Sequence, residues 1–365
     1  MNLYPGRLAL QQRVLPRYRA PFFDLLASAC EGGLSLFTGM PRPVEGIVTT
    51  DRLQVANYRQ GKNIHLFRGS FYLCYQAGLL NWLENWNPDA LIVEANPRYL
   101  STPVAVRWMH TRGRPVLGWG LGAPFKAEGI GIARKVWRVF LKQFDALIAY
   151  SQRGADEYGA LGFPREKIFI AHNSVSAPPS FPLPDRPSTF NLRPSILFVG
   201  RLQARKRVDD LLRACAQLNS TPRLVIVGDG PDRERLQSLA NEIYPKAKFI
   251  GAKHGAELKS YFTEADLFVL PGTGGLAVHE AMSNGLPVIV AQGDGTQDDL
   301  VRQGNGWQIP PGDFEALLAA MKDALSNVAR LRKLGEKSYR IVRDEINIEK
   351  MVEAFVTALN RSTDK

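Results

Sequence analysis

Short apolar runs alternate with segments of helical periodicity along the second half of the chain. Five runs predict strands, at residues 195–199, 223–227, 248–250, 266–270 and 287–291. Between them, apolar residues recur every three or four positions, which predicts helices from residue 208 and over 231–240 and 277–284. Strands that are apolar throughout and separated by helices are typical of a parallel sheet with both faces covered.

The first half of the chain has the same alternation in a looser form. It predicts strands at 8–11, 34–38, 90–94, 115–119 and 146–149, and helices at 21–29, 102–111 and 132–144. Between the halves, residues 177–194 contain six prolines, which exclude a helix or a central strand and indicate a linker. Apolar residues at 348, 351, 352, 355 and 359 predict an amphipathic helix near the end of the chain.

These patterns predict an α/β protein of two domains, each a doubly wound parallel sheet. The predicted boundaries are 1–185 for the N-terminal domain, 186–345 for the C-terminal domain and 346–365 for the final helix. Ligands of such sheets bind at the carboxyl ends of the strands. Two linked sheets therefore predict a ligand site in a cleft between the domains.

The composition excludes several classes of protein. The three cysteines, Cys30, Cys74 and Cys215, lie far apart and outside any metal-binding motif, which argues against a disulfide framework or a zinc site. No apolar run reaches the roughly 18–20 residues that span a bilayer, and the N-terminus lacks the features of a signal peptide. The sequence therefore predicts a cytoplasmic protein.

Most of the net charge of +11 lies in the first half of the chain. Residues 1–180 contain 21 lysines and arginines against 12 aspartates and glutamates. Such an excess predicts an anionic partner, either a membrane surface, a phosphorylated acceptor or nucleic acid. We predict no nucleic-acid partner, because the basic half contains no recognisable reader motif.

The first motif with chemical content is the segment 199–207, VGRLQARKR. A strand ends at Gly200, and Arg201 and Lys206 follow on the loop that enters a helix. Two cations and the amide dipoles of a helix start suit a diphosphate. The alternative is a solvated basic loop, since Arg205 and Arg207 are cationic too.

The second motif is the segment 270–282, LPGTGGLAVHEAM. A strand runs into Gly272, Gly274 and Gly275, whose backbone amides can approach a phosphate closely. Glu280 follows in the first turns of a helix, where a carboxylate can accept the hydroxyls of a ribose. The alternative is a tight turn for the glycines and a favourable helix dipole for Glu280.

The third motif is the turn Gly228-Asp229-Gly230-Pro231 at the end of a strand. It is similar to a dinucleotide fingerprint, but Arg233 occupies the position of the third glycine, which argues against a dehydrogenase. We expect this turn to flank a nucleobase.

Together, these motifs resemble the retaining GT-B glycosyltransferases of family 4, over about residues 190–320. The matching pieces are Gly200-Arg201-Leu202 with Lys206, Gly228-Asp229-Gly230-Pro231, Gly275-Leu276 with Glu280-Ala281-Met282, Gly285-Leu286-Pro287-Val288-Ile289 and Gly304-Asn305-Gly306. No piece is specific alone, but the combination is.

The resemblance implies the GT-B fold, with two Rossmann-like domains, the donor site in the C-terminal domain and the final helix crossing back to the N-terminal one. It assigns the donor pyrophosphate to Arg201 and Lys206, as the catalytic pair, and the ribose to Glu280. The other donor-binding residues that we predict are Gly200, Asp229, Gly230, Gly274, Gly275, Leu276 and Ala277. The implied co-substrate is a UDP- or GDP-linked sugar, with no cofactor. Because the chain has no Asp-x-Asp pair, we expect the two cations to take the place of a metal ion.

The chain departs from this family at two positions. Gly272 stands where the family has the first of two glutamates separated by seven residues, the one that contacts the donor sugar. Leu121 stands where we expect a histidine of the N-terminal domain. Either the sugar is bound differently or the chain has lost activity, and the acid/base residue stays unassigned.

Two basic segments of the N-terminal half are candidates for the acceptor side. Arg17 and Arg19, with Leu121, are the residues that we place there, facing a phosphorylated acceptor such as a lipid-linked sugar diphosphate. The segment 131–144 combines basic and aromatic stripes and is a candidate for binding an anionic bilayer. The alternatives are a solvated loop and a helix packed on its sheet with a wet basic face.

We therefore expect a glycosyltransferase, retaining and metal-independent, that transfers a sugar from a nucleotide donor to a glycan or lipid-linked acceptor in cell-surface polysaccharide synthesis, and that is cytoplasmic or peripheral at the inner membrane face. The alternatives are a silent GT-B scaffold and a nucleotide-sugar epimerase of the same fold. The nucleobase, the sugar, the acceptor and the linkage stay open.

Overall fold

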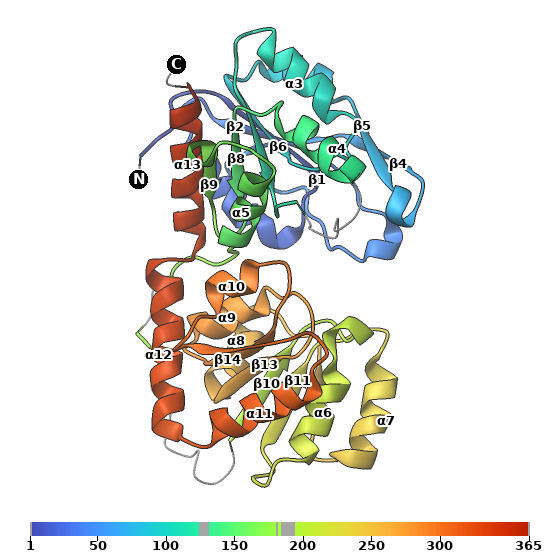
Figure 1. Cartoon of the computed structure of the whole chain (residues 1–365), viewed down its shortest axis with the longest axis vertical. Helices are drawn as coiled ribbons and strands as arrows, with labels where there is room; N and C mark the ends of the chain where they lie inside the picture. The colour runs from blue at the N-terminus through green and yellow to red at the C-terminus, as the bar shows by residue number, and fades with distance from the viewer. Residues whose placement is uncertain (1, 124–130, 180–181, 184–193, 364–365) are drawn as a thin grey trace. The chain divides into compact units, whose positions relative to one another are not determined.

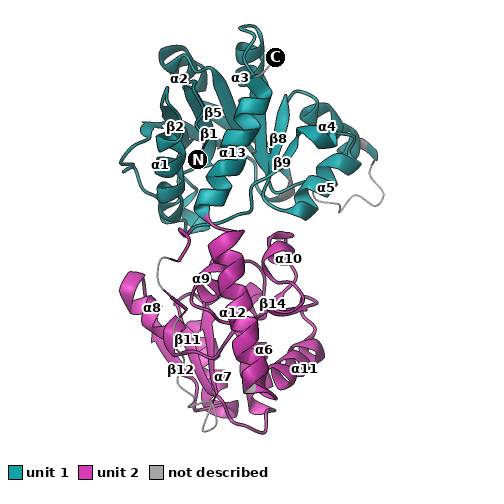
Figure 2. Cartoon of the chain, turned by 90° about the vertical axis from the view of Figure 1, so that its left-hand side faces the viewer, with its two compact units in different colours: residues 1–175, 348–365 teal, residues 176–347 magenta. Residues whose placement is uncertain are grey.

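The computed structural model describes residues 2–123, 131–179, 182–183 and 194–363 (Figure 1). The chain forms two compact units (Figure 2). Unit 1 contains Met1–Val175 and Ile348–Lys365, and unit 2 contains Ser176–Asn347. Most of the predicted linker, residues 184–193, lies outside the described residues.

Unit 1 contains a seven-stranded sheet in the order β3-β2-β1-β6-β7-β8-β9, with every neighbouring pair parallel. Its strands are β1 (Leu8–Val14), β2 (Leu34–Gly39), β3 (Asn57–Gln60), β6 (Ala90–Glu94), β7 (Val116–Gly120), β8 (Ala146–Ala149) and β9 (Ile168–Ile170). An antiparallel hairpin adds β4 (Lys62–Leu66) and β5 (Leu73–Ala77). The helices of this unit are α1 (Ala20–Ser28), α2 (Leu79–Trp86), α3 (Thr102–His110), α4 (Gly131–Leu141), α5 (Gln152–Ala160) and α13 (Ile348–Thr363).

The last helix, α13, is part of the core of unit 1. It packs against α1, β8 and β9. Phe355 is fully buried, with its ring centroid 4.9 Å from that of Trp119 and 5.1 Å from that of Phe22. The apolar positions of the predicted amphipathic helix are therefore the ones that face this core.

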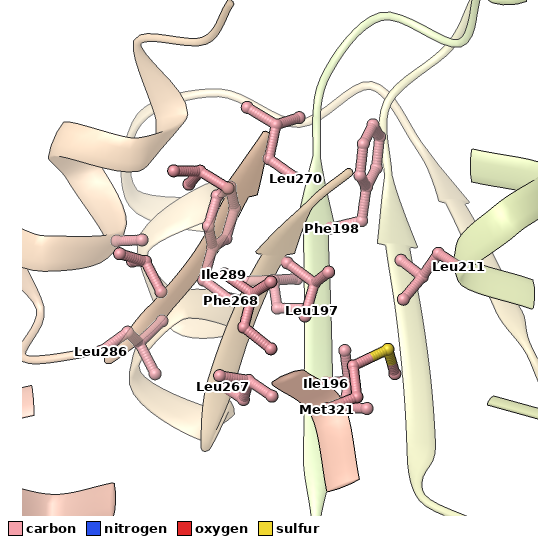
Figure 3. Close-up of a cluster of buried hydrophobic side chains, with 14 of the residues drawn as sticks. Ile196, Leu197, Phe198, Leu211, Leu267, Phe268, Leu270, Leu286, Ile289 and Met321 are labelled. Carbon is pink, nitrogen blue, oxygen red and sulfur yellow. The ribbon is translucent and has the colours of Figure 1, made fainter. Parts of the chain in front are cut away.

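Unit 2 contains a six-stranded parallel sheet in the order β12-β11-β10-β13-β14-β15. Its strands are β10 (Ser195–Val199), β11 (Arg223–Val227), β12 (Lys248–Gly251), β13 (Leu267–Leu270), β14 (Val288–Ala291) and β15 (Gly306–Ile309). The helices are α6 (Val208–Ala216), α7 (Arg233–Ile243), α8 (Gly255–Glu264), α9 (Ala277–Ser283), α10 (Thr296–Leu300), α11 (Phe314–Leu325) and α12 (Val328–Asp344). Side chains such as Ile196, Phe198 and Phe268 fill the core around the central strands (Figure 3).

The predicted fold class is confirmed, because both units are parallel sheets covered by helices. The sequence missed β3, β9, β15 and the hairpin of β4 and β5. The residues of β3 and β4 are exposed or only partly buried, and those of β5 alternate between partly buried, buried and exposed positions, so none of these three strands forms a continuous apolar run. None of the helices within the described ranges combines the length and the apolar character needed to cross a bilayer.

Both sheets have a point where the strand order reverses. In unit 1 the chain passes from β1 to β2 and β3 on one side and then returns to β6 on the other side of β1. In unit 2 the same reversal separates β10 from β13. Ligands of open parallel sheets bind at such switch points, outside the carboxyl ends of the strands.

Candidate functional site

The switch point of unit 2 brings the first two predicted motifs together. Lys206 lies on a short 3-10 helix after β10 and is only 7% exposed. Its ammonium donates hydrogen bonds to the carbonyl oxygens of Thr273 (2.8 Å) and Gly274 (3.0 Å), which follow β13. An ammonium has three N–H donors, so one remains for a ligand. Burial, with a contribution from Arg205, lowers the pKa of Lys206 to about 8.

The glycine loop beside Lys206 exposes unpaired backbone donors. Gly274 and Gly275 have φ angles of +68° and +148°, which favour glycine. The amides of Gly274, Gly275, Leu276 and Ala277 donate to no acceptor within the described part of the chain. Consecutive free amides next to a cation form a concavity that suits an anion such as a diphosphate.

Gly272 is buried where the end of β13 meets the turn that carries Lys206. The amide of Thr273 donates a 3.1 Å hydrogen bond to the carbonyl of Arg205. A Cβ atom at position 272 would lie 2.2 Å from that carbonyl oxygen and 2.5 Å from backbone atoms of Lys206. Contacts this short with backbone leave no room for any side chain, so the close approach requires glycine. The family's glutamate does not fit this arrangement.

Arg201 is exposed directly after Gly200, where β10 ends. It makes no hydrogen bond or ion pair with the residues that the structure describes. Within the described residues, the structure thus places one exposed cation without a partner, Arg201, after β10, and holds a second one, Lys206, through two hydrogen bonds.

The third predicted motif packs against the loop after β10. A Cβ atom on Gly228 would lie 1.9 Å from the carbonyl oxygen of Gly200, and one on Gly230 would lie 2.2 Å from that of Leu202. Asp229 accepts hydrogen bonds from its own neighbour Gly230 (2.7 Å) and from Arg233 Nη1 (3.0 Å). Its carboxylate is therefore engaged in shaping this turn.

Glu280 lies in the first turn of α9 and is half-buried. Burial raises the pKa of its carboxyl, and the nearby His254 opposes that rise. Among the described residues, no side chain or backbone group donates a hydrogen bond to this carboxyl. A half-buried carboxyl without a donor is suited to accept hydroxyl groups of a ligand.

The three residues predicted on the acceptor side lie in unit 1 and differ in exposure. Arg17 is exposed, and Leu121, directly after β7, is 49% exposed. Arg19 is only 6% exposed. Its guanidinium lies 5.6 Å from the ring centroids of Trp119 and Tyr150 and donates to Asn173 Oδ1. Arg19 is thus held inside the unit, in contacts that a basic loop pattern does not reveal.

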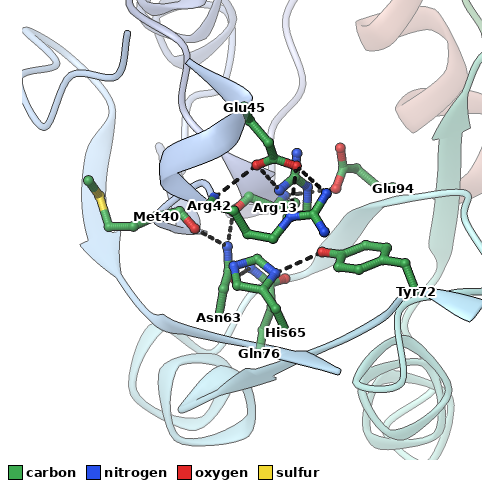
Figure 4. Close-up of polar contacts among 9 residues, drawn as sticks. All are labelled: Arg13, Met40, Arg42, Glu45, Asn63, His65, Tyr72, Gln76 and Glu94. Carbon is green, nitrogen blue, oxygen red and sulfur yellow. Dashed lines mark hydrogen bonds and ion pairs between the residues drawn. The ribbon is translucent and has the colours of Figure 1, made fainter. Parts of the chain in front are cut away.

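The switch point of unit 1 holds a polar cluster that the sequence analysis missed (Figure 4). Arg13, near the end of β1, forms a 2.9 Å ion pair with Glu45. Its backbone amide donates a 2.8 Å hydrogen bond to Glu94, the last residue of β6. Asn63 donates to the carbonyl oxygens of Arg13 (2.7 Å) and Met40 (2.9 Å). No short sequence motif could have predicted this cluster, because Arg13 contacts residues such as Asn63 and Glu94 that lie far away in the chain.

Groups of three or more acidic, histidine or cysteine side chains that could hold a metal ion do not occur within the described ranges. The donors at the switch point of unit 2 are amides, an ammonium and a guanidinium, which bind anions.

The resemblance predicted from the sequence is confirmed, since residues 185–341 match the family model described as Glycosyl transferases group 1. Over 164 residues, 42% of this chain and 42% of the relative, the chain is 38% identical to the GDP-mannose-dependent alpha-mannosyltransferase of Mycobacterium tuberculosis. Over 195 residues, 50% of this chain and 48% of the relative, it is 28% identical to the putative colanic acid biosynthesis glycosyltransferase WcaL of Escherichia coli. The matched region thus spans less than half the length of these curated relatives.

Solved structures are similar over nearly the whole chain. Anabaena Alr3699/HepE in complex with UDP gives a TM-score of 0.72 at 16% identity, covering 99% of this chain and 100% of that one. Sucrose-phosphate synthase from Thermosynechococcus elongatus gives 0.70 at 19% identity, covering 97% and 98%. These likenesses confirm the GT-B fold.

The packing around Gly272 generates a prediction for stability. Gly272→Ala places a methyl group against the backbone of Arg205 and Lys206, so we expect a loss of about 1–3 kcal/mol, as for other overpacked sites. Gly272→Glu begins with the same Cβ atom and should lose at least as much. Thermal melting of the purified variants measures the effect.

Gly131→Ala is the matched control, because a Cβ atom there has nothing within 4 Å. A Gly272→Ala variant that melts together with the wild type and the control contradicts the close packing.

Proposed function

We propose that this chain, which carries a glycosyl transferases group 1 domain over residues 185–341, is a glycosyltransferase that uses a nucleotide-sugar donor. The sugar goes to a hydroxyl of a glycan or lipid-linked acceptor in polysaccharide or glycolipid synthesis. One observation carries the proposal: the Lys206 ammonium lies against a glycine loop in which four consecutive amides have no acceptor among the described residues, at the switch point of unit 2.

The chemistry of sugar transfer requires such a site. Breaking the bond between the anomeric carbon and the diphosphate leaves negative charge on the phosphate oxygens. Donors that are already oriented toward those oxygens stabilise the transition state without reorganisation. In this proposal Lys206 and the loop amides supply fixed donors, and Arg201 closes on the outer oxygens. Their charge makes the reaction independent of a metal ion.

The rest of the donor has candidate ligands too. Glu280 accepts the ribose hydroxyls, and the turn around Asp229 and Gly230 flanks the base. Alr3699/HepE has been solved with UDP and with UDP-glucose, and the mycobacterial relative is named for GDP-mannose. We therefore propose a UDP- or GDP-linked donor. Transfer with retention, through acceptor attack on the leaving-group face, is part of the proposal.

Gly272 gives weight to a second candidate, a GT-B scaffold that binds a nucleotide without transferring a sugar. The close packing at this residue excludes the glutamate that contacts the sugar in the family, so the sugar must be held by other groups or not at all.

A lipid-linked acceptor is supported by an apolar cavity of about 900 Å³ in unit 1. It is lined by Phe67, Phe71, Tyr72 and Val136, with Arg68 and Arg98 at its wall. Phe71 is 81% exposed and Val136 is 51% exposed, whereas Phe140 and Leu141 of the same helix α4 are buried. Apolar side chains beside arginines suit an amphiphile with an anionic head, and on this basis we propose association with an anionic membrane surface.

Turnover of sugar nucleotides tests the main proposal. In the presence of EDTA, one UDP- or GDP-linked sugar should be consumed, slowly with water and faster with an acceptor, and NMR of the product should show the anomeric configuration of the donor. If no sugar nucleotide is consumed while UDP or GDP still raises the melting temperature, the scaffold is the correct function.

Lys206→Met should weaken binding of UDP or GDP by about 10- to 100-fold, the value of a charge-assisted hydrogen bond. Because the pKa of Lys206 is about 8 in the free protein, wild-type affinity should fall as the pH rises from 8 to 10 and the ammonium loses its proton. The variant should show no such fall. Isothermal titration calorimetry across this pH range measures both effects.

Lys246→Met removes an exposed lysine of the same unit and serves as the control. Equal nucleotide affinity in Lys206→Met and in this control would exclude Lys206 from the site.

Phe71→Ser should reduce binding to phosphatidylglycerol vesicles by about 10- to 100-fold, since burying a phenylalanine contributes roughly 1.5–3 kcal/mol. Phosphatidylcholine vesicles should bind weakly in every case, because they lack the negative charge that attracts the arginines. Val44→Ser, which removes an 87% exposed apolar side chain outside the cavity, is the control. Cosedimentation of Phe71→Ser at the wild-type level argues against this surface.

A further inference from the structure

The pairing of β1 with β6 stops before the carboxyl end of β1, at the switch point of unit 1. The two strands pair from Leu8 with Ala90 to Gln11 with Val93, and β1 then bulges between Gln11 and Val14. Beyond the last pair, Arg13 belongs to β1 and Glu94 is the last residue of β6. This switch point is the place where the topology of an open parallel sheet puts a ligand.

The Glu94 carboxyl bridges the two strand ends but keeps capacity for a ligand. It accepts hydrogen bonds from the backbone amide of Arg13 (2.8 Å) and from the side chain of Tyr99. A carboxylate has about four acceptor positions, so roughly two remain. Glu94 as a whole residue is partly exposed. Its carboxyl group lies on the protein interior side, where burial raises its pKa.

Buried amide side chains hold this arrangement in place. Gln76 donates to the carbonyl oxygen of Gln12 (3.1 Å) and to Asn63 Oδ1 (2.9 Å), and it accepts from Gln11. Gln11 also accepts a 3.2 Å hydrogen bond from the amide of Glu94. The bulge is therefore rigid, and the position of the Glu94 carboxyl does not depend on a ligand.

The second carboxyl of the cluster is in the opposite situation. Glu45 accepts from Arg13 Nη1 (2.9 Å), from the backbone amide of Arg42 (2.9 Å) and from Arg42 Nη2 (3.1 Å). These donors lower its pKa and occupy its oxygens. Burial instead raises the pKa of Glu94 to about 7, and the charged or titratable groups around it are Arg13, Tyr99, Cys74 and Tyr150. When the environments of two carboxyls shift their pKa values in opposite directions, the two groups are suited to different roles.

We propose that Glu94 is the residue of unit 1 that binds a hydroxyl group of the acceptor sugar, at the carboxyl ends of β1 and β6. The hydroxyl donates a hydrogen bond to a free oxygen of the carboxylate, which orients the hydroxyl oxygen. Arg13 and Tyr99 act as positioning residues, because they hold the carboxyl through its other oxygens. The assignment rests on the proposed glycosyltransferase function and names the group that meets its acceptor.

A purely structural role, closing the bulge of β1, makes a different prediction. Glutamine at position 94 can accept the hydrogen bond from the Arg13 amide as glutamate does, so Glu94→Gln should preserve the bulge. It removes only the negative charge, and a hydroxyl donates more strongly to a carboxylate than to an amide oxygen. Sugar binding and its pH dependence therefore separate the two roles.

The probes are decyl glycosides of glucose, galactose, mannose and N-acetylglucosamine. Their binding to the full chain is measured by saturation-transfer NMR. At least one should bind the wild type, with an affinity that rises from pH 6 to pH 8 as Glu94 ionises. Glu94→Gln should bind it about tenfold more weakly and without this rise. Tyr99→Phe removes one of the two donors that position the carboxyl but keeps the carboxylate itself, so it should lose less.

Glu84→Gln, the same change at an exposed residue of α2, is the matched control and should behave as the wild type. Thermal melting shows whether each variant is folded; if Glu94→Gln is not, Glu94→Asp replaces it, with the same loss of affinity expected from its shorter reach. The proposal is overturned if no glycoside binds the wild type, or if the folded Glu94 variant has the affinity and pH profile of the control. Donor turnover in water is measured in parallel, so failure of the glycosyltransferase function is seen separately from failure of the Glu94 assignment.

Discussion

The donor-side half of the structure depends on one buried ammonium group. Lys206 is only 7% exposed, and burying a charge without a hydrogen-bond partner costs free energy of folding. The carbonyl oxygens of Thr273 and Gly274 offset that cost, and because they follow β13 while Lys206 follows β10, their hydrogen bonds join the strands across the switch point. The tight approach of the two loops then requires a residue without a side chain at position 272. The departure from the family pattern at Gly272 and the position of Lys206 are thus two consequences of one packing arrangement.

Much of the fold, and the grouping of the candidate residues at the switch point of unit 2, could be predicted from the sequence, for reasons that are local. A strand buried on both faces, such as Leu224–Val227, has to be apolar throughout, and the pattern is visible without any partner. The glycines at 272, 274 and 275 and the cations at 201 and 206 each lie in a short segment that joins a strand to a helix. The topology of a parallel sheet then predicts that these segments lie close together, because the carboxyl ends of neighbouring strands meet at one edge of the sheet.

The acceptor side could not be predicted in the same way, because its contacts join distant segments. Glu94 looks like the end of an apolar strand, and its partner Arg13 lies 81 residues away in sequence. Arg19 looks like part of a solvated loop until Trp119 and Tyr150 are placed beside its guanidinium. The exposed strands β3 and β4 have no apolar periodicity, since they lie at an edge or outside the main sheet. In each case, predicting the contact would have required knowing the strand order, which the sequence of the residues alone does not show.

The two switch points are alike in topology and opposite in chemistry. In each unit the pairing between the first strand and the strand that returns beside it stops before the carboxyl end of the first strand. Unit 2 leaves amides open and adds cations, and the result is a site that attracts an anion. In unit 1, the Glu94 carboxyl accepts the hydrogen bond of the Arg13 amide. The oxygen positions that remain on this carboxyl can accept further hydrogen bonds. A group that is both neutral and a donor, such as a sugar hydroxyl, is the natural complement of the second site, just as a diphosphate is of the first. The proposed difference between the two ligands therefore follows from which backbone groups are left open at each site and which side chains the sequence supplies to meet them.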